Sequence, residues 1–165
     1  MNASSDTRQV DKNLLAAEVL RSSGQVCLRL SGCSMVPAIW PGEIAQIERV
    51  DFRDIAAEDV VLVLQGSRFF VHRVIGVNEA TLRMQGDSLA QADPLVFAKD
   101  LLGRVTAILR HGQWGALRKR DPLEKILAGI VRRSHFVLRV LLWMKAKQTR
   151  AEQEPAFATV EIISP

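Results

Sequence analysis

Three short segments of the sequence contain the side chains that an activated serine requires. They read SGCSMVP, FFVHRV and GDSLAQAD, and they contain Ser34, His72, Asp87 and Asp93. A serine hydroxyl is a weak nucleophile at neutral pH, so it needs an adjacent base and a polar group that orients this base. These residue types indicate acyl-transfer chemistry in which Ser34 attacks, His72 takes its proton and one of the two aspartates holds His72.

The elements around these segments are predicted to hold the serine and the histidine on strands. Apolar residues alternate with polar ones over 26–30, which predicts a strand that ends in a tight turn at Ser31 and Gly32. Ser34 then lies just after a strand end, where its side chain is exposed on a rigid support. His72 lies in the middle of a predicted strand over 69–77, between apolar residues of its own face.

Turn signals separate several more apolar segments, and these predict a mainly β fold class. The segment VVLVL is apolar throughout, which is typical of a strand buried on both faces. A short helix is predicted to begin at Asp11 or Asn13 and to end at Gly24. The remaining predicted strands cover 44–50, 59–64, 81–85 and 101–109.

The C-terminal part differs from this β body in both pattern and charge. After Asp121 the apolar residues recur at helical spacing. Of the 22 Lys and Arg residues, 11 lie within 110–150 against two acidic residues, so this segment carries a charge of +9 and the rest −5. We therefore divide the chain into four parts. These are an N-terminal tail and helix (1–24), a β domain (25–112), an appended basic amphipathic helical segment (113–150) and a flexible tail (151–165).

Composition indicates a single folded domain that stays inside the cell. A chain of 165 residues that is 48% apolar and 24% charged has the mixture of an ordinary globular protein. The polar first 12 residues contain no secretory signal, and no apolar run reaches the roughly 18 residues of a membrane span. Cys27 and Cys33 lack metal-ligand spacing and are interpreted as small residues in or beside strands, so we expect no metal and no cofactor.

Six motifs, taken in order, resemble the superfamily that contains type I signal peptidases and LexA-like self-cleaving regulators. They are SGCSMVP, PGE, VVLVL, HRVIG, QGDS and LLGRV, and they span roughly 26–105. The resemblance implies a LexA/signal-peptidase-like β body with Ser34 as nucleophile and His72 as general base. Bacterial signal peptidases place a lysine at the base position, whereas the endoplasmic-reticulum and archaeal types place a histidine. This chain is most similar to the latter, and an unperturbed histidine, with a pKa of about 6.5, suits a base near neutral pH.

The resemblance also separates the roles of the two aspartates. In histidine-using members the third residue lies six positions after the aspartate of the Gly-Asp turn, which implies that Asp93 orients His72. Asp87 is then the turn residue and supports the site through hydrogen bonds. An Asp-Pro pair such as 93–94 is also an ordinary start of a turn, so this alternative stays open for Asp93.

The oxyanion that forms during acyl transfer needs hydrogen-bond donors, and the resemblance implies only one of them. The backbone N–H of Ser34 is the first candidate. Signal peptidases often add a serine hydroxyl two residues before the nucleophile, but this chain has Gly32 there, so the second donor stays open. Gly32 and Met35 are expected to support the site, while Glu43 and Glu58 replace the aspartate and glycine that are usual at their positions.

These features imply a serine endopeptidase that cleaves a leader or signal-like segment from a peptide or protein substrate. A self-cleaving LexA-like regulator is one alternative, but the roughly 25 residues before the first strand are too few for a helix-turn-helix domain. A catalytically inactive binding module is another. The basic segment over 123–147 is expected either to contact an anionic membrane surface or to pack on its own β body. We do not expect a nucleic-acid partner, because basic residues alone give only nonspecific attraction.

Overall fold

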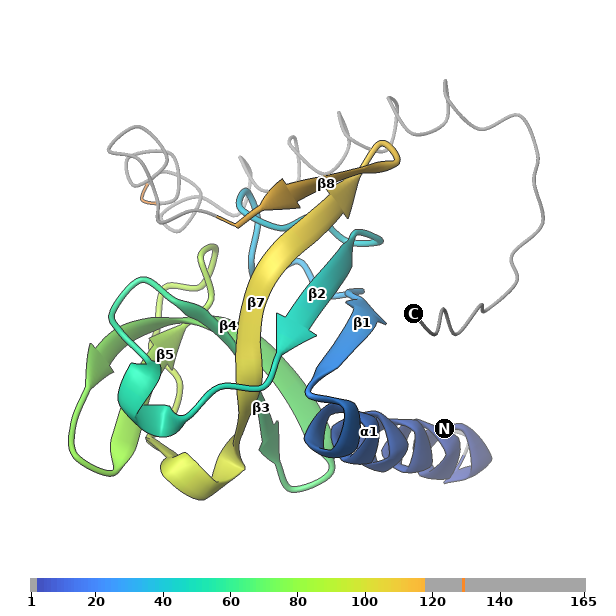
Figure 1. The fold of residues 1–165 in the computed structure, drawn as a ribbon, viewed down its shortest axis with the longest axis horizontal. Helices are drawn as coiled ribbons and strands as arrows, with labels where there is room; N and C mark the ends of the chain where they lie inside the picture. The colour runs from blue at the N-terminus through green and yellow to red at the C-terminus, as the bar shows by residue number, and fades with distance from the viewer. Residues whose placement is uncertain (1–2, 118–128, 130–165) are drawn as a thin grey trace.

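The computed structural model describes residues 3–117 and residue 129, and the first range folds around one antiparallel β-sheet (Figure 1). Helix α1 (Ala3–Ser23) precedes the sheet, and two short 3-10 helices lie at Phe52–Asp54 and Ala98–Asp100. Within the described residues the sheet has eight strands, which are β1 (Gln25–Arg29), β2 (Ile44–Glu48), β3 (Val60–Gln65), β4 (Arg68–Val77), β5 (Thr81–Gln85), β6 (Val96–Phe97), β7 (Leu101–Arg110) and β8 (Gln113–Ala116). The mainly β fold class with an N-terminal helix is therefore confirmed.

The long strand β7 joins two groups of strands. The order across the sheet is β1-β2-β7-β3-β4-β5-β6, and β8 pairs with β7 outside this path. The first part of β7 pairs with β3, and its later part pairs with β2 on one side and β8 on the other. Figure 1 shows β7 as the long curved strand between these two groups.

The apolar segment VVLVL forms β3 and is buried on both faces, as the sequence predicts. Val60 and Leu62 belong to a core cluster that also receives α1. Val61 and Val63, which alternate with them, belong to a second cluster on the opposite face, under β4, β5 and β6. The sheet therefore has a packed core on each side of β3.

The N-terminal helix is longer than the sequence predicts. It begins at Ala3, so Asp11 and Asn13 lie within the helix and the prediction that one of them starts it is wrong. Residues 3–10 contain neither glycine nor proline, so a helix nucleated over the apolar turns can extend through them. The predicted end is confirmed, because Gly24 has φ 79° and donates to Leu20 O.

The β body also extends past its predicted boundary at residue 112. A tight turn at His111 (φ 50°) and Gly112 (φ 75°) leads into β8, so residues 113–116 form a strand and not the start of a helical segment. All four residues of β8 are exposed, which explains why no apolar pattern reveals the strand. The helical segment and the tail predicted after it lie outside the described residues, apart from Gly129, which is helical.

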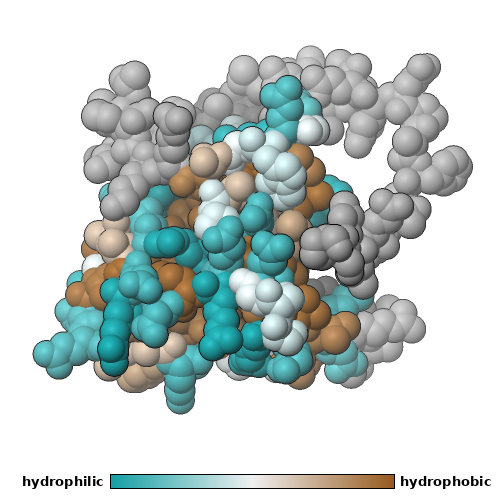
Figure 2. All heavy atoms as spheres, in the orientation of Figure 1, coloured by the Kyte–Doolittle hydropathy of each residue, from teal (hydrophilic) through white to brown (hydrophobic). Residues whose placement is uncertain are grey.

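On the face drawn in Figure 2, hydrophobic and hydrophilic residues alternate in small patches. Exposed large apolar side chains occur on α1, β6 and β8, for example Leu15, Phe97 and Trp114. In the part of the chain that the structure describes, no helix combines the length and the apolar character that a membrane span requires. The expected membrane contact through 123–147 falls outside that part.

Candidate active site

The structure brings Ser34, His72 and Asp93 together in a chain of two hydrogen bonds. His72 Nε2 lies 2.9 Å from Ser34 Oγ, and His72 Nδ1 lies 2.5 Å from Asp93 Oδ2. The three residues come from the loop after β1, the middle of β4 and the loop after β5. The sequence singled out all three, and their side chains meet although 38 and 21 residues separate them along the chain.

These contacts determine which ring nitrogen of His72 can accept a proton. An ionised carboxylate only accepts hydrogen bonds, so Asp93 requires a proton on Nδ1. In a neutral imidazole the other nitrogen, Nε2, then presents its lone pair to the Ser34 hydroxyl. The arrangement therefore leaves His72 ready to take the proton of Ser34 Oγ.

Strand pairing and burial fix His72 in place. It pairs with Val61 of β3 in the middle of β4 and is 5% exposed. Its neighbours along the same face, Phe70 and Val74, pack against the second core cluster. A strand buried in this way holds the imidazole in one orientation, whereas a loop would leave it free to turn.

The segment that carries Ser34 is a compact turn anchored by buried apolar residues. Val36 N–H donates to Cys33 O at 3.2 Å and Ile39 N–H donates to Met35 O at 2.9 Å. Met35 and Ile39 are buried in the first core cluster. Met35 thus supports the site by packing, while Ser34 beside it remains partly exposed.

The two aspartates of GDSLAQAD reach different partners. Asp93 N–H donates to Met84 O at 2.9 Å, which ties the loop to β5 and aims the Asp93 carboxylate at His72. Asp87 is fully buried and forms a bidentate ion pair with Arg73, at 3.0 Å from Nε to Oδ1 and 2.8 Å from Nη2 to Oδ2. Asp93 therefore contacts the imidazole, and Asp87 contacts a different strand residue.

Arg73 is a site residue that the sequence did not reveal. It lies next to His72 on β4 and points to the opposite face, where it is 1% exposed. Besides Asp87, it donates through Nη1 to Glu58 O at 2.9 Å. A buried, bidentate arginine pair fixes the geometry of both partners. The only signal in the sequence was a charge among the apolar residues of that face of β4.

Gly86 and Ser88 contact the nucleophile segment directly. A Cβ added to Gly86 would lie 2.8 Å from Ser34 O, so only glycine allows this approach. Ser88 N–H donates to Ser34 O at 2.9 Å, and its hydroxyl lies 3.0 Å from Cys33 O and 3.1 Å from Ser34 O. The turn over 86–88 therefore packs against the backbone on which the Ser34 side chain is mounted.

Gly32 leaves open space beside the serine hydroxyl. A Cβ at this position would lie 3.9 Å from Ser34 Oγ, which is an ordinary van der Waals contact. Among the described residues, the backbone N–H groups of Ser34 and Met35 donate to no protein acceptor. The Ser34 N–H thus remains available as the oxyanion donor that the sequence predicts.

Glu43 and Glu58, which replace the residues usual at their motif positions, each take part in a local contact. Glu43 accepts from Trp40 N–H at 2.9 Å and from Arg110 Nε at 3.0 Å, and so closes the turn that follows the nucleophile segment. Glu58 has φ 76°, a left-handed conformation that favours glycine. Its carbonyl oxygen accepts from Arg73, so the backbone at Glu58 belongs to the surroundings of the buried ion pair.

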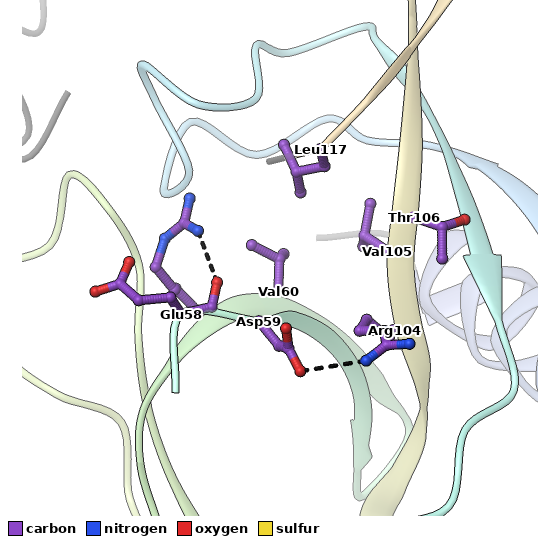
Figure 3. Close-up of a pocket in the computed structure, with 8 residues that line it drawn as sticks. Glu58, Asp59, Val60, Arg104, Val105, Thr106 and Leu117 are labelled. Atoms are coloured by element: carbon purple, nitrogen blue, oxygen red, sulfur yellow. Dashed lines mark hydrogen bonds and ion pairs between the residues drawn. The ribbon is translucent and has the colours of Figure 1, made fainter. Parts of the chain in front are cut away.

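A cavity of about 270 Å³ lies apart from Ser34, His72 and Asp93 (Figure 3). Val60, Val105 and Leu117 supply apolar walls, and Asp59 pairs with Arg104 at 3.4 Å on its edge. Arg73 also lines it. The cavity therefore belongs to the Arg73 side of β4, and none of the three hydrogen-bonded site residues lines it.

The described residues contain no group of three or more His, Cys, Asp and Glu side chains that could hold a metal ion. Cys27 and Cys33 are both exposed and free of a disulfide. Cys27 lies in β1 and Cys33 in the loop after it, as the sequence predicts. Partial burial raises the pKa of the Cys27 thiol, which lowers its thiolate fraction.

No protein-family model and no curated protein matches this chain. The chemistry of the site is therefore inferred from its own geometry. The resemblance carried by the six motifs stays a prediction.

Proposed function

We propose that this chain is a serine endopeptidase, similar to the signal peptidases that use a histidine base, and that it cleaves a leader or signal-like segment from a peptide or protein. One observation carries the proposal, the hydrogen-bonded chain from Ser34 Oγ through His72 to Asp93. A serine, an imidazole and a carboxylate in this order form the arrangement that activates a serine on several unrelated folds.

In the acylation step, Ser34 Oγ attacks the carbonyl carbon of a peptide bond while His72 Nε2 takes the hydroxyl proton. Asp93 holds Nδ1–H and stabilises the imidazolium that results. The tetrahedral oxyanion accepts from the Ser34 N–H. When the intermediate collapses, the C–N bond breaks, and His72 returns its proton to the departing amine, which leaves an ester on Ser34.

In the deacylation step, water takes the place of the amine. His72 removes a proton from this water, the resulting hydroxide attacks the ester carbon, and the C–O bond to Ser34 breaks. The proton then passes from His72 back to Ser34 Oγ, which restores the starting state. The geometry supports acyl transfer in general, and the choice of a peptide as acyl donor rests on the resemblance of the six motifs.

The proposal is tested by incubating three forms of the full chain with a diverse peptide library and identifying the products by mass spectrometry. Wild type should cleave a subset of peptides, and Ser34→Ala should lose at least about 10⁴-fold in rate. Ser67→Ala removes an exposed hydroxyl in the β3–β4 turn and serves as the matched control, with wild-type activity. Identical products from wild type and Ser34→Ala would refute the proposal.

Self-cleavage is separated in the same experiment by intact mass after prolonged incubation without peptides. A fragment that appears in wild type but not in Ser34→Ala, at a rate independent of protein concentration, would identify a self-cleaving regulator. Absence of this fragment together with cleavage of added peptides would identify a peptidase that acts on other molecules.

A further inference from the structure

Ser88 makes a set of contacts with the nucleophile segment that the mechanism above does not use. It is 7% exposed, its backbone N–H donates to Ser34 O, and its hydroxyl lies within hydrogen-bond distance of both Cys33 O and Ser34 O. Cys33 O and Ser34 O are consecutive along the chain, so one residue holds two successive carbonyl groups on the same side of the turn.

This constraint also determines where two N–H groups point. In a trans peptide the C=O and the following N–H point in opposite directions, and both peptide bonds concerned are trans. With Cys33 O and Ser34 O directed toward Ser88, the N–H groups of Ser34 and Met35 are directed away from it. Neither N–H has a protein acceptor within the described residues.

The position of Ser88 is itself fixed from two sides. Asp87, its neighbour, is held by the buried bidentate pair with Arg73. Gly86 lies against Ser34 O so closely that a Cβ there would be 2.8 Å away. The turn over 86–88 is therefore held rigidly against the nucleophile segment.

From these contacts we propose that Ser88 is a positioning residue for the oxyanion site, which it forms by orienting the backbone N–H groups of Ser34 and Met35 as a pair of donors. The inference rests on the proposed acyl transfer at Ser34. The Met35 N–H is then the second oxyanion donor, which Gly32 does not provide. A backbone N–H takes the place of a side-chain hydroxyl. Ser88 does not contact the substrate and acts only through the backbone at Cys33 and Ser34.

The test compares wild type with Ser88→Ala, Ser88→Thr and the control Ser67→Ala, using a peptide from the library that wild type cleaves. Loss of one oxyanion donor lowers kcat by about 10²- to 10³-fold, and misorientation of the pair should lower it by about 10- to 100-fold in Ser88→Ala. KM should change less than about threefold. Ser88→Thr keeps the hydroxyl and should restore kcat to within about fivefold of wild type.

The outcomes separate this inference from the proposed function. If Ser34→Ala cleaves as wild type does, acyl transfer at Ser34 is refuted, and the role of Ser88 in it falls as well. If cleavage depends on Ser34 while Ser88→Ala keeps wild-type kcat, only the inference about Ser88 is overturned. A purely structural role would lower the fraction of active protein without changing kcat for each active site.

A measurement that needs no substrate tests the same geometry. In NMR spectra, Ser88→Ala should shift the carbonyl carbons of Cys33 and Ser34 and the amide signals of Ser34 and Met35, and Ser88→Thr should return them. Resonances that do not move in Ser88→Ala would show that Ser88 does not orient these groups, and would overturn the inference even if no cleaved peptide were found.

Discussion

His72 and Arg73 are neighbours on β4, and their side chains point to opposite faces of the strand. Each pairs with a different aspartate of the same loop. The side chains of His72 and Asp93 are 7% and 17% exposed, and through His72 Nε2 their pair reaches Ser34, which is itself partly exposed. The side chains of Arg73 and Asp87 are 1% and 0% exposed, and their pair is sealed in the interior. One strand and one loop therefore build a reactive pair on one face and a fixed pair on the other.

The difference between the two pairs lies in what each one stabilises. An imidazole that must gain and lose a proton needs a partner that tolerates both states, and Asp93 lies at the edge where water can reach it. An arginine stays protonated, so its pair with Asp87 serves as a permanent link between β4 and the loop. We expect changes to the first pair to affect turnover and changes to the second to affect folding.

Among changes to the two pairs, Asp93→Asn has the largest expected effect on turnover. An amide can donate to Nδ1, which favours the tautomer with a proton on Nε2, and that nitrogen then cannot accept from Ser34. We expect kcat to fall by roughly 10³- to 10⁴-fold while the free energy of unfolding changes by only about 1 kcal/mol. Peptide-cleavage kinetics and urea unfolding measure the two quantities. A variant that keeps more than a tenth of wild-type kcat would contradict the role of Asp93.

Asp87→Asn is the matching change in the sealed pair, with the same loss of one carboxylate. It leaves the Arg73 guanidinium buried without a counter-charge, which destabilises a protein by about 3–5 kcal/mol. Urea unfolding monitored by circular dichroism should show this loss. The kcat of the folded fraction should fall far less than in Asp93→Asn, because Asp87 acts on the Ser34 segment only through its neighbour Ser88 and does not contact His72. Equal losses of kcat in the two variants would break the distinction between the pairs.

Gly86→Ala tests the contact between the 86–88 turn and the backbone of the nucleophile segment. The added Cβ would meet Ser34 O at 2.8 Å, and because this atom belongs to the backbone, the nucleophile segment must shift. We expect a destabilisation of about 1–3 kcal/mol together with about a tenfold lower kcat. Gly76→Ala is the control, since its Cβ would meet only Arg83 Cβ at 3.9 Å. Similar behaviour of the two variants would show that the close approach is unimportant.

Gly32→Ser sharpens the comparison on the reactive face by adding a donor. Its Cβ would lie 3.9 Å from Ser34 Oγ, so a hydroxyl fits beside the nucleophile without a clash. We expect kcat to rise by up to about tenfold, because an additional donor stabilises the oxyanion. Gly32→Ala fills the same space without a hydroxyl and should show no increase. Equal kcat values for the two variants would place residue 32 away from the oxyanion.

Glu58→Gly has the smallest expected effect and concerns the sealed face. Glu58 has φ 76°, and a non-glycine residue in this region is strained by about 1–2 kcal/mol. Glycine removes the strain but gains freedom in the unfolded chain, so the net stabilisation should be below about 1 kcal/mol. Glu79→Gly, at a position without positive φ, should not stabilise the protein. Thermal unfolding of both variants measures the difference, and kcat should stay at the wild-type value.

The sequence allowed the reactive face to be predicted much better than the sealed one. Alternating apolar residues revealed β1, apolar segments between turn signals revealed β2, β3, β4, β5 and β7, and the residue types of Ser34, His72 and Asp93 pointed to one chemistry. Arg73 and Asp87 carry no comparable signal, because an ion pair depends on which faces meet in space. The same holds for Ser88, whose hydroxyl contacts a segment 54 residues away.

The start of α1 and the strands β6 and β8 were missed for local physical reasons. Residues 3–10 are mostly polar, so periodicity gave no reason to start the helix before Asp11. Strand β8 is exposed along its whole length and β6 has only two residues, so neither shows an apolar alternation. Patterns of hydrophobicity reveal a helix or strand that buries one face over several residues. The first turns of α1 and the strands β6 and β8 do not show such a pattern.

The topology of β7 has a consequence for the order in which the protein matures during synthesis. Strands β1 and β2 form one group and β3 to β6 another, and in the described part of the chain the sheet connects the two groups only through β7. Ser34 follows β1 and His72 lies in β4, so the strands that flank the two residues join one sheet only when β7 is added. Under the proposed function, we therefore expect nascent chains that end before β7 to lack activity, because the sheet is not yet closed.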